Sequence, residues 1–421
     1  MASSVLEDLR WRDLIAHCTD EVALGRALAA GPVTFYCGFD PTAPSLHFGN
    51  LVQLVTMRRL QDAGHRPIAV VGGATGLVGD PSGKSAERAL NEEEVVAAWV
   101  DRIRAQVENI LPMDGENPAR IVNNLDWTAG LSTITFLRDM GKHFAVARML
   151  SREAVSARLH AEGISFTEFS YQVLQAYDYL ELYRRHGCVL QTGGSDQWGN
   201  LTAGVDLIRR VEGASVHAVA TPLITRADGV KYGKTEVGAI WLDPEITPPF
   251  AFYQYFLNQT DADIVALLKV FSFRSHEEID ELAQAVSQRP EERAAQRALA
   301  EELTALVHGA GEAARAVAAS RAMFGQGDLA SVDERTLAAS VAELPRTEVS
   351  GDLPGIVDLL VASGLASSRS DARRTVADGG AYVNNVRVTD PAAVPGADDF
   401  LHGRWLVLRR GKRHLGVVLR R

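Results

Sequence analysis

The sequence predicts an α/β fold in which a parallel sheet with crossover helices is followed by a helical region and a small α+β module. Two apolar runs without alternation, 33–37 and 67–71, have the pattern of strands buried on both faces. Each is followed by a helical pattern, and strands that alternate with helices form parallel sheets that bind ligands at the strands' carboxyl ends. The length of 421 residues is enough for two or three domains.

The same reasoning places the other elements in order along the chain. Helices are expected over residues 5–30, 46–60, 91–111, 166–183 and 195–210, and strands at 120–123 and 188–191. Residues 125–165 have helical stretches around 133–140 and 151–160 and look like an insertion in the sheet. Residues 247–325 are almost wholly helical in pattern. Residues 326–352 are rich in Ser, Asp and Glu, which predicts a linker or small connecting element.

The last module carries a charge opposite to that of the rest of the chain. From Pro354 to Arg421 there are 11 basic and 6 acidic residues, a net charge of +5, against −15 for the remainder. A basic module on an acidic body is typical of a protein that binds a polyanion such as an RNA backbone. A solvated charged terminus would have the same composition, and charge alone does not separate the two readings.

The cysteines and the N-terminus favour a cytoplasmic protein. Cys18, Cys37 and Cys188 are far apart and form no ligand pair, which favours a reducing compartment and argues against a structural zinc site. The first residues, MASSVLEDLRWRDL, predict an amphipathic helix that carries acids rather than a signal sequence. No apolar run reaches the length needed to span a membrane.

Residues 36–50, YCGFDPTAPSLHFGN, read as a strand, a tight loop and the start of a helix. A helix N-terminus presents free N–H groups and a partial positive charge, which suit a phosphate. His47 and Asn50 are three residues apart and share a face of the first turn, and Gly49 leaves room for a flat ring. An ordinary βα turn with a surface histidine fits this stretch equally well.

A glycine-rich stretch from Gly72 to Ser85 follows the second predicted strand. It resembles a phosphate loop, but Gly79 leaves three residues before the Gly-Lys pair where a Walker A loop needs four, so it is not a P-loop. It offers backbone without side chains beside a nucleotide, the carboxylate of Asp80, and two cations, Lys84 and Arg88.

Three further stretches place polar groups where a ligand could meet them. Tyr171, Gln175 and Asp178 fall on one face of the helix predicted at 166–183, and their apolar neighbours favour a polar pocket over a solvent face. GGSDQWGN puts polar side chains at the carboxyl end of a strand, although Ser195 could simply be a helix N-cap. Lys231 and Lys234 flank a glycine and would suit a polyphosphate clamp, a weak signal by itself.

Five blocks match those of bacterial tyrosyl-tRNA synthetases, in order and roughly in interval: YCGFDPTAPSLHFGN, GGATGLVGDPSGK, YQVLQAYD, GGSDQWGN and KYGKT. The stretch LVASGLASSRSDARRTVADGGAYVNN resembles an S4-type RNA-binding domain, which follows the helical domain in that family. The resemblance covers nearly the whole chain. It implies a Rossmann-type catalytic domain at 1–225 with a dimer-interface insertion near 125–165, a signature loop and helical anticodon-binding domain at 226–325, a linker at 326–352 and an S4-like RNA-binding domain at 353–421.

The resemblance also implies a reaction and its partners. L-Tyrosine and ATP would give tyrosyl-adenylate and pyrophosphate, and the tyrosyl group would pass to the 3′-terminal ribose of tRNA(Tyr). Mg²⁺ would accompany ATP without a metal cage built by the protein, and the protein would be a homodimer with no membrane partner. Attack by an already ionised carboxylate needs no enzyme nucleophile, so positioning and charge neutralisation would carry catalysis.

Site residues carry over onto the matching positions as four sets. The catalytic set comprises the HIGH-type signature, His47 and Asn50, and the KMSKS-type signature, Lys231, Lys234 and Thr235. The tyrosine-binding set is Tyr36 and Asp178 at the phenol, Asp80, Tyr171 and Gln175 at the ammonium, and Gln197. The ATP-binding set is Gly38, Asp40, Thr42, Gly49, Lys84, Arg88, Gly194, Asp196 and Lys234. The RNA-binding set is Arg369, Arg373, Arg374, Arg409, Arg410, Lys412 and Arg413.

Both signatures depart from their generic patterns. Asn50 stands where the HIGH-type signature has its second histidine, and Phe48 is its second residue. Asparagine keeps a hydrogen-bond donor but cannot carry charge, and activity is expected to survive because the expected role is hydrogen bonding. KYGKT lacks the Met and the first Ser of its pattern, although Lys-aromatic-Gly-Lys-Thr is usual in this family.

Two alternatives remain to be weighed: a related synthetase, and a protein of another functional class. A tryptophanyl-tRNA synthetase has a similar catalytic fold, but Tyr36 with Asp178 and the S4-like tail argue against it. A non-catalytic RNA-binding paralogue would also keep the fold, and the presence of Asp80, Lys231 and Lys234 argues against it. No editing domain is apparent, and buried groups that bond a phenol hydroxyl can by themselves reject a substrate that lacks it.

Overall fold

A computed structural model describes residues 4–82, 91–152, 155, 156, 159, 163–227, 229 and 239–421. The chain divides into two compact units, which we describe separately: one comprises 1–243 and 260–290, the other 244–259 and 291–421. None of the helices within the described residues is long and apolar enough to cross a membrane.

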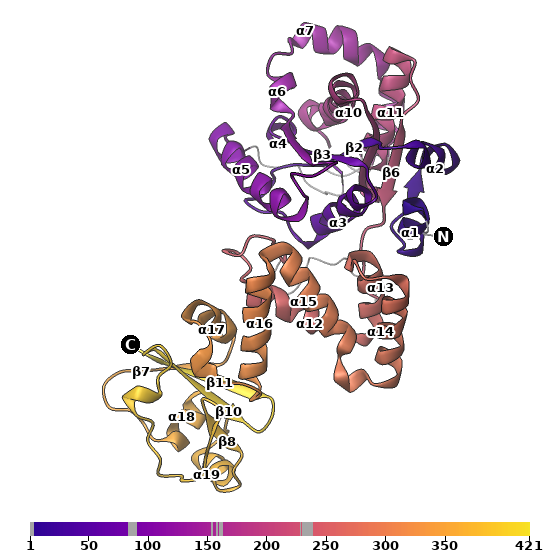
Figure 1. Cartoon of the computed structure of the whole chain (residues 1–421). Helices are drawn as coiled ribbons and strands as arrows, with labels where there is room; N and C mark the ends of the chain where they lie inside the picture. The colour runs from indigo at the N-terminus through magenta and orange to yellow at the C-terminus, as the bar shows by residue number, and fades with distance from the viewer. Residues whose placement is uncertain are drawn as a thin grey trace. The chain divides into compact units, whose positions relative to one another are not determined.

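The first unit is built on a six-stranded sheet in the order β1-β6-β5-β2-β3-β4 (Figure 1). Its strands are β1 His17–Cys18, β2 Thr34–Phe39, β3 Arg66–Val71, β4 Arg120–Asn123, β5 Cys188–Gly194 and β6 His217–Thr221. β1 runs antiparallel to β6, and every other neighbouring pair is parallel. The predicted parallel sheet is therefore confirmed, and β5 extends past the expected strand end to the glycines that line the site.

Helices cover both faces of this sheet (Figure 1). α3 Phe48–Asp62 and α5 Glu93–Ile110 lie on one face, and α10 Phe166–His186 and α11 Trp198–Glu212 on the other. The other α-helices that the structure describes in this unit are α1 Val5–Trp11, α2 Glu21–Ala30, α4 Thr75–Val78, α6 Leu125–Thr128, α7 Thr133–Thr135, α8 Val146–Leu150, α13 Asp261–Phe271 and α14 His276–Gln288. Short π and 3-10 helices, Phe136–Met140 and Gly141–His143, lie within the predicted insertion, and a 3-10 turn at Ser195–Gln197 precedes α11.

The helical pattern predicted over residues 5–30 is interrupted, so that part of the prediction was wrong. Asp13 has a positive φ of 58° at the end of α1, and β1 follows. The side chain of Asp20 then caps a new helix by accepting from the N–H of Ala23 at 2.9 Å. Local turn and capping chemistry overrides the amphipathic pattern here.

The second unit combines helices with a five-stranded sheet in the order β7-β11-β10-β8-β9. Its strands are β7 Arg346–Val349, β8 Ala381–Val383, β9 Val386–Val388, β10 Trp405–Arg410 and β11 His414–Arg420. Its α-helices are α12 Pro249–Leu257, α15 Ala294–His308, α16 Ala310–Met323, α17 Glu334–Val341, α18 Ile356–Ala362 and α19 Arg369–Ala377. Short 3-10 turns occupy Leu329–Ser331 and Ala397–Asp399.

The stretch 326–352 has more regular structure than its composition predicts. It contains α17, and β7 pairs in parallel with β11 to form an edge of the C-terminal sheet. Residues on α16 and α17 share a hydrophobic cluster with Trp405 and Val407 of β10 and Leu415 and Val417 of β11. The C-terminal sheet is thus packed into the second unit through a common core.

Candidate active site

A cavity of about 590 Å³ opens at the carboxyl ends of β2 and β5 in the first unit. Parallel α/β sheets bind ligands at this edge. All fourteen tyrosine-, ATP- and HIGH-type residues predicted from motifs that the structure describes line this cavity: Tyr36, Gly38, Asp40, Thr42, His47, Gly49, Asn50, Asp80, Tyr171, Gln175, Asp178, Gly194, Asp196 and Gln197. The expectation that the row on α10 faces a pocket is confirmed. Lys84, Arg88, Lys231, Lys234 and Thr235 lie outside the described residues.

One end of the cavity holds a buried tyrosine and a buried carboxylate. Among the described residues the hydroxyl of Tyr36, which is 1% exposed, has no hydrogen-bond partner. Burial, and then the nearby charge of Asp178, raise the pKa of Tyr36 well above its usual value, so its hydroxyl is a donor. An unpartnered hydroxyl in such a place calls for a polar ligand group, because an unsatisfied buried polar atom is costly.

Asp178 is held from both sides by donors that follow β4. Asn124 Nδ2 donates to Asp178 Oδ2 at 2.9 Å, and Trp127 Nε1 donates to Asp178 Oδ1 at 2.7 Å. Burial raises the pKa of Asp178 to about 7, against the opposing effect of these two hydrogen bonds. The carboxyl group is therefore poised to change its charge near neutral pH, and a donor from a ligand would favour the charged form.

A second group of carboxylates lies along the cavity wall. Asp40 accepts from Thr75 Oγ1 at 2.6 Å and from the hydroxyl of Tyr171 at 2.5 Å. Burial and the charge of Asp40 raise the pKa of Tyr171 well above its usual value, so this hydroxyl is also a donor. Gln197 Nε2 donates to Asp80 Oδ2 at 2.6 Å. Carboxylates and phenol oxygens on one wall favour a cationic ligand group there.

The turn before α3 is closed by its own side chains. His47 Nδ1 accepts from the N–H of Gly49 at 2.9 Å, and the N–H of His47 donates to Asn50 Oδ1 at 3.1 Å. The neutral imidazole therefore carries its proton on Nε2, away from the turn. A Cβ at Gly49 would lie 2.8 Å from His47 Cε1, so this geometry requires glycine. The amide of Asn50 caps the helix, which gives the asparagine a local role as well as its place in the signature.

Motif reasoning missed several residues that line this cavity or hold its polar groups, among them Asn124, Trp127 and Gln191. Asn124 directly follows a strand that was predicted from sequence, and Gln191 is the last residue of another. A rule that inspects every residue at a strand's carboxyl end would have found both. Gln191 is 1% exposed and pairs in register with Tyr36 across the sheet, and its Oε1 has no partner among the described residues.

The predicted RNA-binding residues all lie in the second unit. Arg369, Arg373, Arg374, Lys412 and Arg413 are exposed. Arg409 is buried, lies 3.9 Å from the centre of the Tyr382 ring and donates to the carbonyl of Gly411 at 2.6 Å. Arg410 makes a bidentate ion pair with Asp371 at 2.8 and 2.9 Å. The fold therefore engages Arg409 and Arg410 most closely. Arg369 and Arg374 stay exposed, although they pair with Asp358 at 2.6 Å and Asp371 at 3.4 Å.

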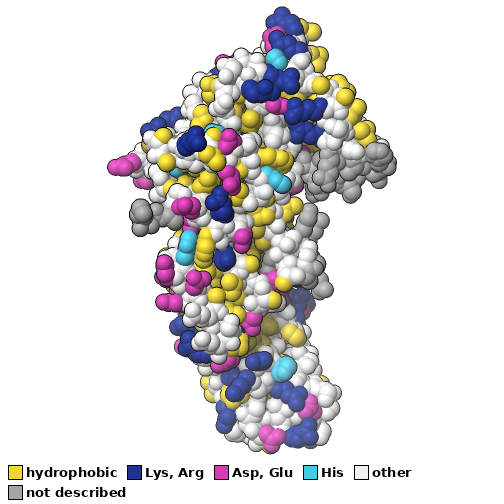
Figure 2. All heavy atoms as spheres, turned by 90° about the vertical axis from the view of Figure 1, so that its right-hand side faces the viewer, with side chains coloured by type: hydrophobic (Ala, Val, Ile, Leu, Met, Phe, Trp, Pro, Cys, Tyr) yellow, Lys and Arg dark blue, Asp and Glu magenta, His cyan; other side chains and the backbone are white. Residues whose placement is uncertain are grey.

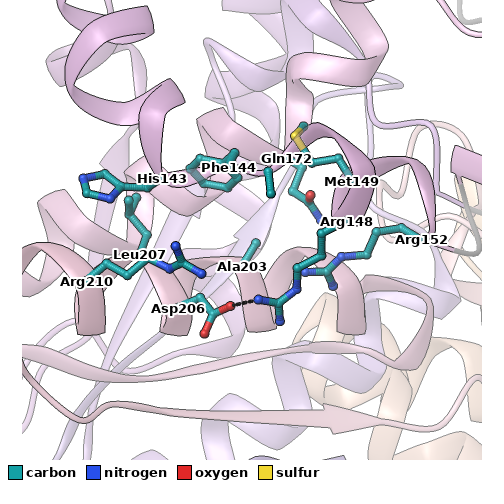
Figure 3. A pocket seen from close by; sticks show the side chains of 11 residues that line it. His143, Phe144, Arg148, Met149, Arg152, Gln172, Ala203, Asp206, Leu207 and Arg210 are labelled. Atoms are coloured by element: carbon teal, nitrogen blue, oxygen red, sulfur yellow. Dashed lines mark hydrogen bonds and ion pairs between the residues drawn. The ribbon is translucent and has the colours of Figure 1, made fainter.

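A second, smaller pocket lies between the predicted insertion and α11 (Figure 3). Its volume is about 40 Å³, which is enough for a few water molecules and not for a nucleotide. Two of its lining residues form an ion pair, with Arg148 Nη1 2.5 Å from Asp206 Oδ2 (Figure 3). None of the residues predicted from motifs lines this pocket, so we assign the chemistry to the larger cavity.

The larger cavity has carboxylates but no metal cage within the part of the chain that the structure describes. No group of three or more His, Cys, Asp or Glu side chains there could hold a metal ion. Asp40 and Asp80 accept hydrogen bonds from protein donors. These residues fit a divalent cation whose ligands come mainly from phosphates and water.

Comparisons with known proteins agree with this geometry. The chain matches the family described as tRNA synthetases class I (W and Y) over residues 28–325, and the tyrosine–tRNA ligase SYY-like C-terminal domain over 336–418. Tyrosine–tRNA ligases of Streptomyces coelicolor and Acidothermus cellulolyticus are 62% and 58% identical to it, over 99% of both sequences in each case. The structure of a C-terminally truncated Aspergillus nidulans mitochondrial tyrosyl-tRNA synthetase has a TM-score of 0.70 and 30% identity, covering 76% of this chain and 94% of that one. These relatives do not favour the tryptophanyl alternative, and the chain belongs to the tyrosine–tRNA ligase family of class I tRNA synthetases.

Proposed function

We propose that this aminoacyl-tRNA ligase joins L-tyrosine to ATP in the larger cavity, releasing pyrophosphate, and then passes the tyrosyl group to the 3′ end of tRNA(Tyr). The observation that carries the proposal is the buried, unpartnered hydroxyl of Tyr36 close to Asp178. A substrate phenol donates to the Asp178 carboxylate and accepts from Tyr36, which satisfies both groups. Phenylalanine would leave the Tyr36 hydroxyl unsatisfied and give Asp178 no further donor, and indole presents only a donor.

The other end of tyrosine meets the wall of carboxylates. Asp80, Tyr171 and Gln175 surround the ammonium, and the buried Oε1 of Gln175, which lacks a partner among the described residues, is one acceptor for it. Gln197, held by Asp80 at 2.6 Å, contacts the tyrosyl group. This arrangement leaves the substrate carboxylate directed toward the nucleotide, where it attacks the α-phosphate.

The turn before α3 receives the phosphates. His47 Nε2–H is a donor directed away from the turn, and the aligned peptide dipoles of a 15-residue helix add a partial positive charge. Asp40 and Asp196 contact the ribose. Lys84, Arg88, Lys231, Lys234 and Thr235 neutralise the departing pyrophosphate in this proposal. Mg²⁺ bound to ATP would supply further charge neutralisation there.

We also propose a homodimer formed through the insertion near 125–165. Hydrophobic side chains there are unusually open to solvent: Ile134 is 70%, Val146 59% and Leu137 50% exposed. Figure 2 shows hydrophobic side chains beside Lys and Arg at the end that carries α7 in Figure 1. Several large apolar side chains exposed in one short segment support a subunit interface there. Sedimentation of the wild type and of Ile134→Asp tests this, since the variant is expected to be monomeric.

The C-terminal sheet and α19 form the proposed S4-like RNA-binding surface, with the exposed arginines and lysine as contacts to the tRNA backbone. The domain boundaries 1–225, 226–325, 326–352 and 353–421 are part of the same proposal. We further propose a cytoplasmic location, supported by three free cysteines, Cys18, Cys37 and Cys188.

Amino-acid-dependent exchange between ATP and pyrophosphate tests the central proposal. Tyrosine, tryptophan and phenylalanine are supplied separately to the purified full chain. Exchange with tyrosine alone is expected, and Tyr36→Phe should reduce the preference for tyrosine over phenylalanine. Exchange with tryptophan would instead indicate a tryptophanyl-tRNA synthetase. No exchange in protein shown to be folded would favour a non-catalytic RNA-binding role.

A further inference from the structure

Gln106 is the one polar residue on the buried face of α5. The other buried residues of this helix are all apolar: Val96, Val100, Ile103, Val107 and Ile110. Gln106 is buried with them and is only 8% exposed. A buried polar side chain on an apolar face needs hydrogen bonds to offset its desolvation. The side-chain amide oxygen of Gln106 accepts a hydrogen bond from the backbone just before His47.

The contacts of Gln106 converge on Ser45 and Leu46. Gln106 Oε1 accepts from the N–H of Leu46 at 2.9 Å and faces Ser45 Oγ at 3.3 Å. Ser45 is 4% exposed, and its hydroxyl proton is shared between Gln106 and the carbonyl of Leu46, which lies at 2.7 Å. These two side chains therefore fix the backbone of the residue that precedes His47.

Ser45 and the backbone around Leu46 also hold the segment that carries Trp241. Ser45 Oγ accepts from the N–H of Asp243 at 3.1 Å. The N–H of Leu242 donates to Leu46 at 2.9 Å, and that of Phe48 donates to Ile240 at 2.8 Å, which forms an antiparallel bridge on either side of His47. α5 contacts this bridge again one turn away, where Arg102 pairs with Asp243 at 3.6 Å.

We infer that Gln106 and Ser45 are positioning residues for adenylate formation, which act through His47 by fixing the turn before α3 against α5. The inference rests on the proposed role of His47 at the ATP phosphates. Catalysis by positioning is sensitive to small displacements, and an error of about 1 Å can lower a rate by about 100-fold. The residues proposed to bind tyrosine are contacted by neither Gln106 nor Ser45. The affinity of the enzyme for tyrosine should therefore be independent of the hydrogen bonds that these two residues make.

Gln106→Met keeps the length of the side chain and removes its acceptor. We expect kcat for tyrosine-dependent pyrophosphate exchange to fall by about 10- to 100-fold, with the affinity for tyrosine in equilibrium dialysis unchanged. Gln106→Glu keeps an acceptor at the same reach and should retain more of kcat than the Met variant. Ser45→Ala is a milder second variant that should lower kcat in the same direction.

Gln61→Met is the matched control. Gln61 is also a buried glutamine, and its Nε2 donates to the carbonyls of Pro112 and Asn117 at 2.8 and 3.0 Å. It lies near the opposite end of α3 from His47, about 21 Å along the helix. We expect this variant to lose thermal stability comparably to Gln106→Met and to keep kcat.

A double-mutant cycle with His47→Ala separates the two hypotheses. If His47→Ala leaves kcat unchanged, the proposed role of His47 fails, and the inference fails with it. If His47→Ala lowers kcat, the Gln106→Met effect should shrink strongly in that background, because the residue acts through His47. An undiminished effect there, a wild-type kcat in Gln106→Met and Ser45→Ala, or an equal loss in Gln61→Met would each overturn the inference alone.

Discussion

Replacing Trp127 by Phe tests whether the indole N–H supports the charged form of Asp178. The substitution removes a 2.7 Å donor to Asp178 Oδ1 and leaves an aromatic ring in place. A hydrogen bond to a charged group contributes about 1.5–3 kcal/mol, and about 1.4 kcal/mol corresponds to a tenfold change in an acid dissociation constant. Burial already raises the pKa of Asp178 to about 7. The pKa of Asp178 in the variant should therefore lie about one to two pH units higher.

This shift predicts a loss of tyrosine affinity that depends on pH. Near pH 7 the carboxyl of the variant is mostly protonated, and KM for tyrosine should rise about 10-fold. At about pH 9 the carboxyl ionises again, and KM should return toward the wild-type value. Pyrophosphate exchange over this pH range measures the effect, with Trp405→Phe, buried in the second unit, as the matched control. A loss that is independent of pH, or no loss, would refute the argument that Trp127 acts through the charge of Asp178.

Three other predictions follow from the same structure. Asp178 binds its proton more tightly when folded than when unfolded, so the free energy of unfolding should fall by about 4 kcal/mol as the pH rises from about 4 to about 7; Asp178→Asn should remove this slope in urea titrations without tyrosine. Lys234→Ala should slow adenylate formation more than it weakens tyrosine binding, and equal losses of both would contradict a phosphate role. Deleting residues 353–421 should leave pyrophosphate exchange intact and weaken tRNA charging. It should also lower the melting temperature of the second unit, because Trp405 and Val407 are removed from the core shared with α16 and α17; loss of exchange would show that the tail is structural.

Sequence patterns predicted the sheet of the first unit and most of the polar residues of its cavity. Hydrophobic periodicity and apolar runs predicted β2, β3, β4 and β5. The shared helical face of Tyr171, Gln175 and Asp178 predicted a pocket. Both kinds of signal are local along the chain, which is why the sequence alone shows them. β6 was not predicted, although it contains the short apolar run 218–220. β1 is two residues long and was assigned to a helix, and its pairing with β6 depends on residues about 200 positions away.

The support of the site was harder to predict than the site itself. Asn124 and Trp127 reach Asp178 only because β4 lies beside β3, and Gln106 reaches Leu46 only because α5 packs on α3. Such contacts join residues more than 50 positions apart, and no local pattern marks them. The same reason explains β7: a stretch rich in Ser, Asp and Glu becomes a strand because β11 offers an unpaired edge.

The hydrogen bonds around Asp178 also connect the two ends of the proposed tyrosine site. Asn124 Nδ2 donates both to Asp178 and to Thr75 Oγ1, at 2.9 and 3.0 Å, and Thr75 in turn donates to Asp40, which accepts from Tyr171. The charge of Asp40 raises the pKa of Asp178, so the two carboxylates oppose each other's ionisation. A substrate ammonium beside Tyr171 would offset that repulsion and favour the charged form of Asp178, which is the form that accepts the phenol hydroxyl. Recognition of the ammonium and of the phenol is therefore coupled, and a ligand that lacks the ammonium should also lose part of the contribution of its hydroxyl.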